Sequence, residues 1–107
     1  MIDLYYLSGS PYAWRVLLAL EHKELQYKRI DLSFENGDFK SETYLALNPR
    51  GKVPVLIDGS VTLYESPAIL EYLEDKYRDS GNNLLPKDVG ERAISRRIIN
   101  EIDVYLD

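Results

Sequence analysis

Residues 1–32, MIDLYYLSGSPYAWRVLLALEHKELQYKRIDL, decide the fold of this chain. A short apolar run over 2–7 ends in the chain breakers of 8–10, which is typical of a buried strand. Ser10-Pro11 then supplies a helix N-cap and a proline at the first helical position, and apolar side chains recur at helical spacing to about residue 23. Residues 25–32 form a second predicted strand. A strand, a helix and a strand this close together predict a βαβ unit whose two strands are parallel.

The following residues predict an antiparallel half of the same sheet. Residues 39–47 carry weak helical signals that end at Asn48-Pro49, because the residue before a proline disfavours the helical backbone. Residues 53–57 and 61–64 are β-forming and are joined by the hairpin signal Asp58-Gly59. Ser66-Pro67 repeats the N-cap and first-turn pairing and opens a helix to about residue 77. Residues 1–77 are therefore predicted to form one α/β domain.

The remainder of the chain predicts a connection and one more helix. Residues 78–88 are dense in turn-forming residues and predict a linker. Residues 89–107 carry an apolar helical face, formed by Ala93, Ile94, Ile98, Ile102, Tyr105 and Leu106. Because an apolar stripe needs a cover, we expect this helix to begin a further helical domain, to pack on the first unit, or to meet another subunit.

Composition excludes several classes of function. With 45% hydrophobic and 29% charged residues in 107, the chain has the composition of a globular domain, and its net charge of -5 disfavours nucleic-acid binding. The absence of Cys excludes disulfides and any thiol nucleophile supplied by the protein. A single His, His22, disfavours His-based metal sites and Ser-His triads, so we expect no metal. No leader or membrane span is recognisable, and we expect a cytoplasmic protein without membrane partners.

Two kinds of candidate site follow from the residues themselves. Ser10-Pro11 and Ser66-Pro67 each open a helix directly after a strand, where backbone amides can receive a carboxylate or a thiolate. The alternative is that each serine only caps its helix. Val53-Pro54 precedes a strand, and a cis bond is possible there, although only about 5–6% of X-Pro bonds are cis.

Three motifs in order carry a family resemblance. SPYAWR at 10–15, NPRGKVPVL at 48–56 and ESPAILEYL at 65–73 together resemble the N-terminal domain of cytosolic glutathione transferases. The resemblance implies a thioredoxin-like βαβ-α-ββα domain over 1–77. The segment 78–88 and the helix over 89–107 are similar to the family's linker and to the first helix of its all-α domain, which is then incomplete. SPYAWR is similar to the serine-type classes, in particular zeta and tau.

The resemblance implies a set of glutathione-binding residues. It implies that Pro54 is cis and that the backbone of Val53 pairs with the cysteinyl unit of glutathione. The Glu65 carboxylate then faces the γ-glutamyl ammonium, and the Ser66 hydroxyl with its helix N-terminus receives the γ-glutamyl carboxylate.

Basic residues complete that implied set. Lys40 and Lys52 match positions that reach the glycyl carboxylate in plant-type serine classes, and Arg50 is a third candidate. The alternative for both lysines is solvated surface charge.

Ser10 decides the implied chemistry. It matches the hydroxyl that hydrogen-bonds the glutathione sulfur in serine-type classes, where other members carry Cys. Because Cys is absent, the mixed-disulfide route is closed. The resemblance therefore implies an enzyme, a glutathione transferase that activates bound glutathione as a thiolate for conjugation to small electrophiles, or for their isomerisation or dehalogenation.

A second function stays open from the sequence. The same fold also serves as a non-catalytic interaction or assembly module, and the intact ligand set of this chain favours glutathione binding over that alternative. The family resemblance further implies a homodimer for the full-length protein.

Overall fold

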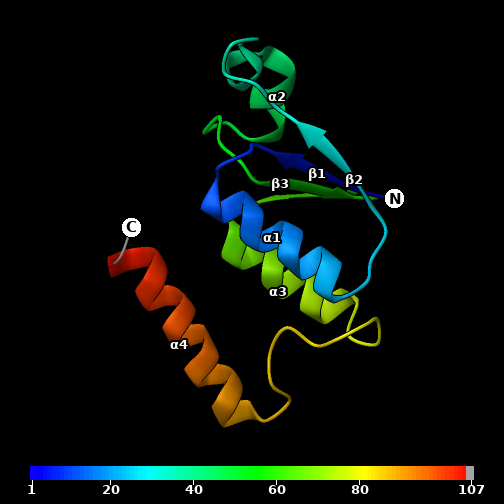
Figure 1. Cartoon of the computed structure of the whole chain (residues 1–107), viewed down its shortest axis with the longest axis vertical. Coiled ribbons are helices and arrows are strands. Elements are labelled where there is room, and N and C mark those ends of the chain that lie inside the picture. The colour runs from blue at the N-terminus through cyan, green and yellow to red at the C-terminus, as the bar shows by residue number, and fades with distance from the viewer. Residues whose placement is uncertain (106–107) are drawn as a thin grey trace.

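A four-stranded sheet forms the centre of the protein, whose computed structural model describes residues 1–105 (Figure 1). The strand order is β2-β1-β3-β4. The strands are β1 (Ile2–Tyr6), β2 (Tyr27–Asp31), β3 (Val55–Asp58) and β4 (Val61–Tyr64). The β1 and β2 strands are parallel, whereas β3 is antiparallel to both β1 and β4.

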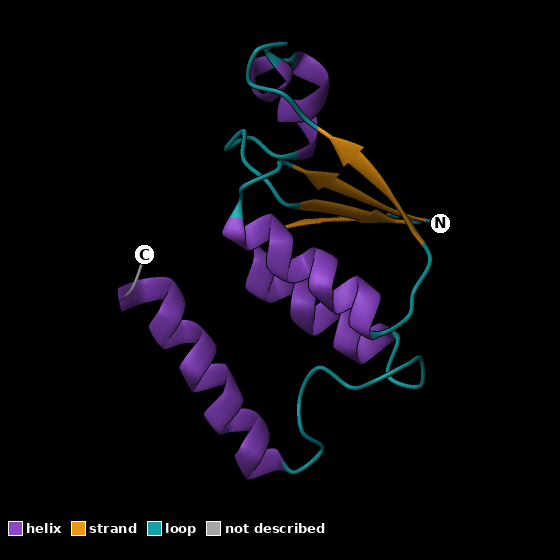
Figure 2. Cartoon of the chain, in the orientation of Figure 1, coloured by secondary structure: helices purple, strands orange, loops and turns teal. Residues whose placement is uncertain are grey.

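Helices cover both faces of this sheet (Figure 2). The helices are α1 (Pro11–His22), the 3₁₀ helix η1 (Asp38–Lys40), α2 (Glu42–Leu47), α3 (Ser66–Lys76) and α4 (Val89–Tyr105). Helices α1 and α3 pack side by side on one face, and η1 with α2 covers the other. This topology confirms the predicted thioredoxin-like α/β class, including the parallel βαβ unit and the antiparallel β3–β4 hairpin.

The alternation of side chains along the strands separates two cores. Ile2, Leu4 and Tyr6 of β1 are buried in the cluster beneath α1 and α3. Tyr5 points to the opposite face, where its ring centroid lies 5.7 Å from that of Tyr44 on α2. Successive strand residues face opposite sides of a sheet, so one short strand supports both layers.

The prediction that Ser66 caps α3 is wrong. The N-cap is Glu65, which has a positive φ of 75° and whose carbonyl accepts the Ile69 N–H at 3.1 Å. Because Glu65 makes the turn into the helix, Ser66 is already its first helical residue. Ser10, in contrast, is confirmed as the cap of α1, since its hydroxyl accepts the Ala13 N–H at 3.2 Å.

Several strand boundaries also differ from the prediction. Strand β2 begins at Tyr27 rather than at 25, because residues 23–26 first complete the turn out of α1. Strand β3 begins at Val55 rather than at 53, after a cis peptide bond between Val53 and Pro54. Strand β3 also ends one residue later than predicted, because Asp58 pairs with Ile2 and Val61 in the ladder and is not part of the turn.

The segment 78–88 is anchored to the first unit. Lys23 at the end of α1 is fully buried and forms a 2.9 Å ion pair with Glu74 of α3. The Glu74 carboxylate also accepts the N–H groups of Leu84 and Leu85 at 3.0 and 2.8 Å. One buried carboxylate thus joins α1, α3 and the segment that follows them.

Helix α4 lies beside the α1–α3 pair, on the side away from the sheet (Figure 1). Two ion pairs of 2.8 Å link it to the first unit, Arg15–Asp103 and Arg96–Glu71. Its Ile94, Ile98 and Ile102 are exposed. The side chain of Tyr105 and residue Leu106, which the sequence assigns to the same apolar face, lie outside the described residues.

No helix within residues 1–105 is long and apolar enough to cross a membrane.

Candidate functional site

One edge of the sheet gathers most of the predicted site residues. Tyr5 near the end of β1 pairs with Val55, and Val55 pairs with Tyr64 at the end of β4. The loop after β1, the Val53–Pro54 bond and the Glu65–Ser66 turn therefore meet at the same edge. Strands β1 and β4 end here and β3 begins here, and in open α/β sheets ligands bind outside the carboxyl ends of the parallel strands.

Ser10 presents a hydroxyl proton at this edge. Its Oγ accepts the Ala13 N–H, and its own backbone N–H donates to the Leu7 carbonyl at 3.1 Å. A hydroxyl that accepts one hydrogen bond still has its proton to donate. The N-terminus of α1 adds a positive dipole end at the same point, which favours an anionic acceptor.

A shallow cavity of about 400 Å³ adjoins Ser10. Its wall includes Pro11 and the exposed ring of Trp14, one turn further along α1. A sulfur atom held at Ser10 would therefore lie beside an aromatic surface.

The Val53–Pro54 bond is cis, as the resemblance implies. Neither the N–H nor the carbonyl of Val53 is hydrogen-bonded to any described residue, so both can pair with an extended peptide. The preceding carbonyl, that of Lys52, is fixed by the Tyr44 hydroxyl and by Asn48 Nδ2, the latter at 3.0 Å. These contacts hold the backbone that leads into the cis bond.

Ser66 and Glu65 differ in their surroundings. Ser66 is 3% exposed, and its buried Oγ has no hydrogen-bond partner among the described residues. A buried hydroxyl without a partner is destabilising, and a ligand carboxylate would remove that cost. Glu65 is exposed, and its Oε1 accepts a hydrogen bond of 3.2 Å from Nη1 of Arg50.

Lys40 and Lys52 lie on two loops that are in contact. Lys40 ends η1 directly after Phe39, and a Cβ atom on Gly51 would lie 3.0 Å from the Phe39 carbonyl oxygen. Both lysines are exposed, and neither is ion-paired to a described residue. Both can therefore reach an anion without breaking an existing pair.

Two features of this edge were missed by the sequence analysis. Asn48 was interpreted only as a helix end, but it is 3% exposed and its Oδ1 also accepts the Arg50 N–H at 3.0 Å. The Arg50–Glu65 pair was missed because the two residues are far apart in sequence. The Asn-Pro pair was the only local signal of a structured loop here.

Comparison with known proteins now identifies the fold family. Residues 9–76 match the family model described as the N-terminal domain of glutathione S-transferase. The chain belongs to this family. The match spans the loop after β1, the cis bond and helix α3, so it covers nearly all of the edge described above.

Similarity to individual proteins and solved structures supports the same family for this glutathione S-transferase domain. Glutathione S-transferase A of Pleuronectes platessa is 46% identical over 88 residues, which are 81% of this chain and 39% of the relative. The structure of the beta-etherase LigF from Sphingobium sp. strain SYK-6 matches with a TM-score of 0.92 at 32% identity, over 97% of this chain and 43% of that one. A glutathione transferase homologue from Sulfitobacter, solved with bound glutathione, matches with a TM-score of 0.86 at 28% identity, over 97% and 49%. The chain spans about two fifths of the length of the curated relatives that it matches.

Two buried carboxylates of the domain lie away from this edge. Burial alone would raise the pKa of Asp58, but hydrogen bonds from Tyr77, Lys76 and Tyr72 outweigh it and lower the pKa. All three donors bind Oδ2, at 2.6, 2.9 and 2.8 Å. For Glu74, burial likewise opposes ionisation, and the hydrogen bonds from two backbone N–H groups and Lys23 lower the pKa. Both groups therefore stabilise the scaffold in their ionised form.

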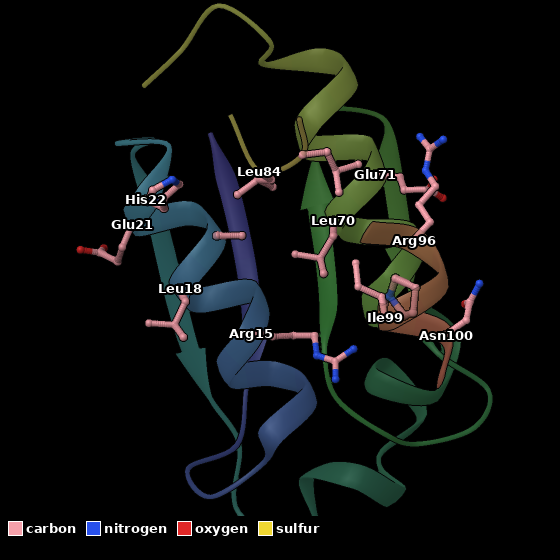
Figure 3. Close-up of a pocket in the computed structure, with 13 residues that line it drawn as sticks. Arg15, Leu18, Glu21, His22, Leu70, Glu71, Leu84, Arg96, Ile99 and Asn100 are labelled. Carbon is pink, nitrogen blue, oxygen red and sulfur yellow. The ribbon is translucent and has the colours of Figure 1, made fainter. Parts of the chain in front are cut away.

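A cavity of about 690 Å³ lies between α1, α3 and α4 (Figure 3). Leu18 of α1, Leu70 of α3 and Ile99 of α4 form part of its wall. None of the predicted glutathione ligands lines it. It separates α4 from the first unit and is distinct from the edge at Ser10.

Proposed function

We propose that this chain binds glutathione and activates its thiol for transfer to a small electrophile. The observation that carries the proposal is the convergence at one sheet edge of the Ser10 hydroxyl with two groups that have no hydrogen-bond partner within residues 1–105, the backbone of Val53 and the hydroxyl of Ser66. These groups match the thiol, the peptide and the terminal carboxylate of one ligand. The Sulfitobacter relative, solved with bound glutathione, supports glutathione as the ligand.

Each end of glutathione has a counterpart. The Val53 N–H and carbonyl would pair with the cysteinyl backbone in strand fashion, beside Pro54. Ser66 and the N-terminus of α3 would bind the γ-glutamyl carboxylate, and Glu65 the ammonium. Lys40 and Lys52 would bind the glycyl carboxylate.

Ser10 would stabilise the thiolate. A free thiol has a pKa of about 8.5, and lowering it by about two units requires roughly 2.7 kcal/mol. A hydrogen bond to a charged group contributes about 1.5–3 kcal/mol and a helix N-terminus about 0.3–1 kcal/mol. The Ser10 hydroxyl and the start of α1 together suffice, and no general base is required.

The wider protein is part of the proposal. We assign 1–77 as the glutathione-binding domain, 78–88 as the linker and α4 as the first helix of the family's all-α domain. Four points stay predictions from the resemblance. They are serine-type chemistry of the zeta or tau kind, the conjugation, isomerisation or dehalogenation of electrophiles, homodimerisation, and a cytoplasmic location.

Calorimetric titration of the chain with glutathione and with S-methylglutathione tests the proposal. We expect saturable heat with both ligands, and a weaker interaction for Ser66→Ala, which removes the buried hydroxyl. The matched control is Ser60→Ala, which removes an exposed serine in the β3–β4 turn. A folded chain that gives neither heat nor a thermal shift at millimolar glutathione would refute the proposal and favour the non-catalytic interaction module.

A further inference from the structure

The Arg50–Glu65 pair joins two segments of the proposed glutathione site. Arg50 belongs to the loop that leads to Lys52 and Val53, whereas Glu65 belongs to the turn that opens α3. Arg50 Nη1 lies 3.2 Å from Glu65 Oε1, so the guanidinium links the peptide-binding segment to the segment assigned to the γ-glutamyl end. A ligand that joins these two segments has to take up the space between them.

The two partners are fixed by their backbones but not by their side chains. The Arg50 N–H is held by buried Asn48, and the Glu65 carbonyl is held by the first turn of α3. The side chains are 69% and 61% exposed, and one hydrogen bond joins them. Exposed ion pairs of this kind are weak, so the guanidinium can leave at little cost.

The chemistry of the pair matches the chemistry of the ligand. A carboxylate that binds a guanidinium in the free chain is the same carboxylate that would bind a primary ammonium. Two cations on one carboxylate repel each other, so each weakens the binding of the other.

We propose that Arg50 is an internal competitor for the ammonium subsite, displaced from Glu65 when a γ-glutamyl ligand with a free amino group binds. This inference rests on the proposed function, because it assumes that glutathione binds at this edge. It reverses the role that the resemblance implies for Arg50, since a glycyl-carboxylate ligand would strengthen glutathione binding and a competitor weakens it. The two roles predict opposite effects of the same substitution.

The test compares glutathione with N-acetylglutathione, which lacks the ammonium, by calorimetry at low ionic strength. Arg50→Gln should raise the affinity for glutathione roughly 1.5- to 5-fold, the range expected for removal of one exposed pair. The affinity for N-acetylglutathione should not rise. The matched control is Arg97→Gln, which breaks an equally exposed 3.2 Å pair with Glu101 on α4 and should change neither affinity.

A second measurement uses the unmodified chain and does not depend on the variant folding. The guanidinium carbon NMR resonance of Arg50 should shift on addition of glutathione and stay in place with N-acetylglutathione. Three outcomes would overturn the inference while leaving glutathione binding intact. They are an unchanged or lower glutathione affinity in Arg50→Gln, an equal rise in affinity for both ligands, and an Arg50 resonance that does not shift with glutathione. Absence of heat from the unmodified chain with either ligand would overturn the proposed function, and this inference with it.

Discussion

Replacing Lys23 by Met should destabilise the domain strongly, because it removes one partner of a buried ion pair. The Lys23 side chain is fully buried and that of Glu74 is 3% exposed, and their charged atoms are 2.9 Å apart. Loss of the cation leaves the Glu74 carboxylate buried with only the N–H groups of Leu84 and Leu85 to solvate it. Removing one partner of such a pair typically costs about 3–5 kcal/mol. The two remaining N–H donors place the expected cost near the lower limit, at about 3 kcal/mol.

Urea unfolding followed by far-UV circular dichroism measures this cost. Met preserves most of the aliphatic volume of Lys23, so the loss reports on the ammonium, including its 3.1 Å hydrogen bond to the Tyr77 carbonyl, rather than on a cavity. The double variant Lys23→Met/Glu74→Gln should be destabilised by at least about 1–2 kcal/mol less than the sum of the two single variants. Each single variant leaves one buried charge unpaired, whereas the double variant leaves none.

Arg97→Gln is the matched control for this measurement. It breaks an ion pair whose side chains are 65% and 56% exposed, and it should cost less than about 1 kcal/mol. If Lys23→Met cost no more than this control, or if the two single-variant costs were additive, the buried pair would not stabilise the domain in the way argued here.

Three further variants test other parts of the structure. Ser10→Ala should raise the pKa of the bound glutathione thiol by about one to two units, read from thiolate absorbance against pH, while Ser8→Ala leaves that pKa unchanged. The reverse result would show that Ser10 is not the thiol-activating group. Asp58→Asn should cost about 1–3 kcal/mol at neutral pH. Because the folded-state pKa of Asp58 is lowered, its contribution to stability is present above the unfolded pKa and is lost as pH falls through the folded pKa. The difference in free energy of unfolding between Asp58→Asn and the unmodified chain, measured in urea, should therefore shrink under acid. A pH-independent difference would contradict this. Gly81→Ala should destabilise the domain more than Gly59→Ala. Both glycines have φ near +60°, but only at position 81 would a Cβ collide with backbone, since it would lie 2.2 Å from the Lys23 carbonyl oxygen. Equal thermal midpoints of the two variants would refute that contact.

Local sequence was sufficient for the parts of the molecule that depend on neighbouring residues. The strands and α1 follow from the spacing of apolar side chains, and Ser10-Pro11 caps its helix through a contact only three residues away. The α/β class follows from element order, since a βαβ unit has one preferred hand. That Ser10, Val53 and Ser66 serve one ligand was implied only by the family resemblance. The three family motifs could be recognised without a structure because each is a contiguous stretch of sequence.

Tertiary structure alone decided which polar groups are paired and which are not. Ser10 and Ser66 stand in the same Ser-Pro context, yet the Ser10 hydroxyl caps its helix and the buried Ser66 hydroxyl has no partner in the described part of the chain. The difference arises because the positive φ of Glu65 shifts the start of α3. Lys23 looks like an ordinary charged residue at a helix end, but it is buried because Glu74 lies opposite it on another helix.

The Arg50–Glu65 contact likewise joins residues 15 positions apart. Such pairings depend on distances between elements, and these distances are set by how the helices and loops pack on the sheet. Local periodicity carries no information about them, whereas it carries nearly all the information about the strands and helices themselves.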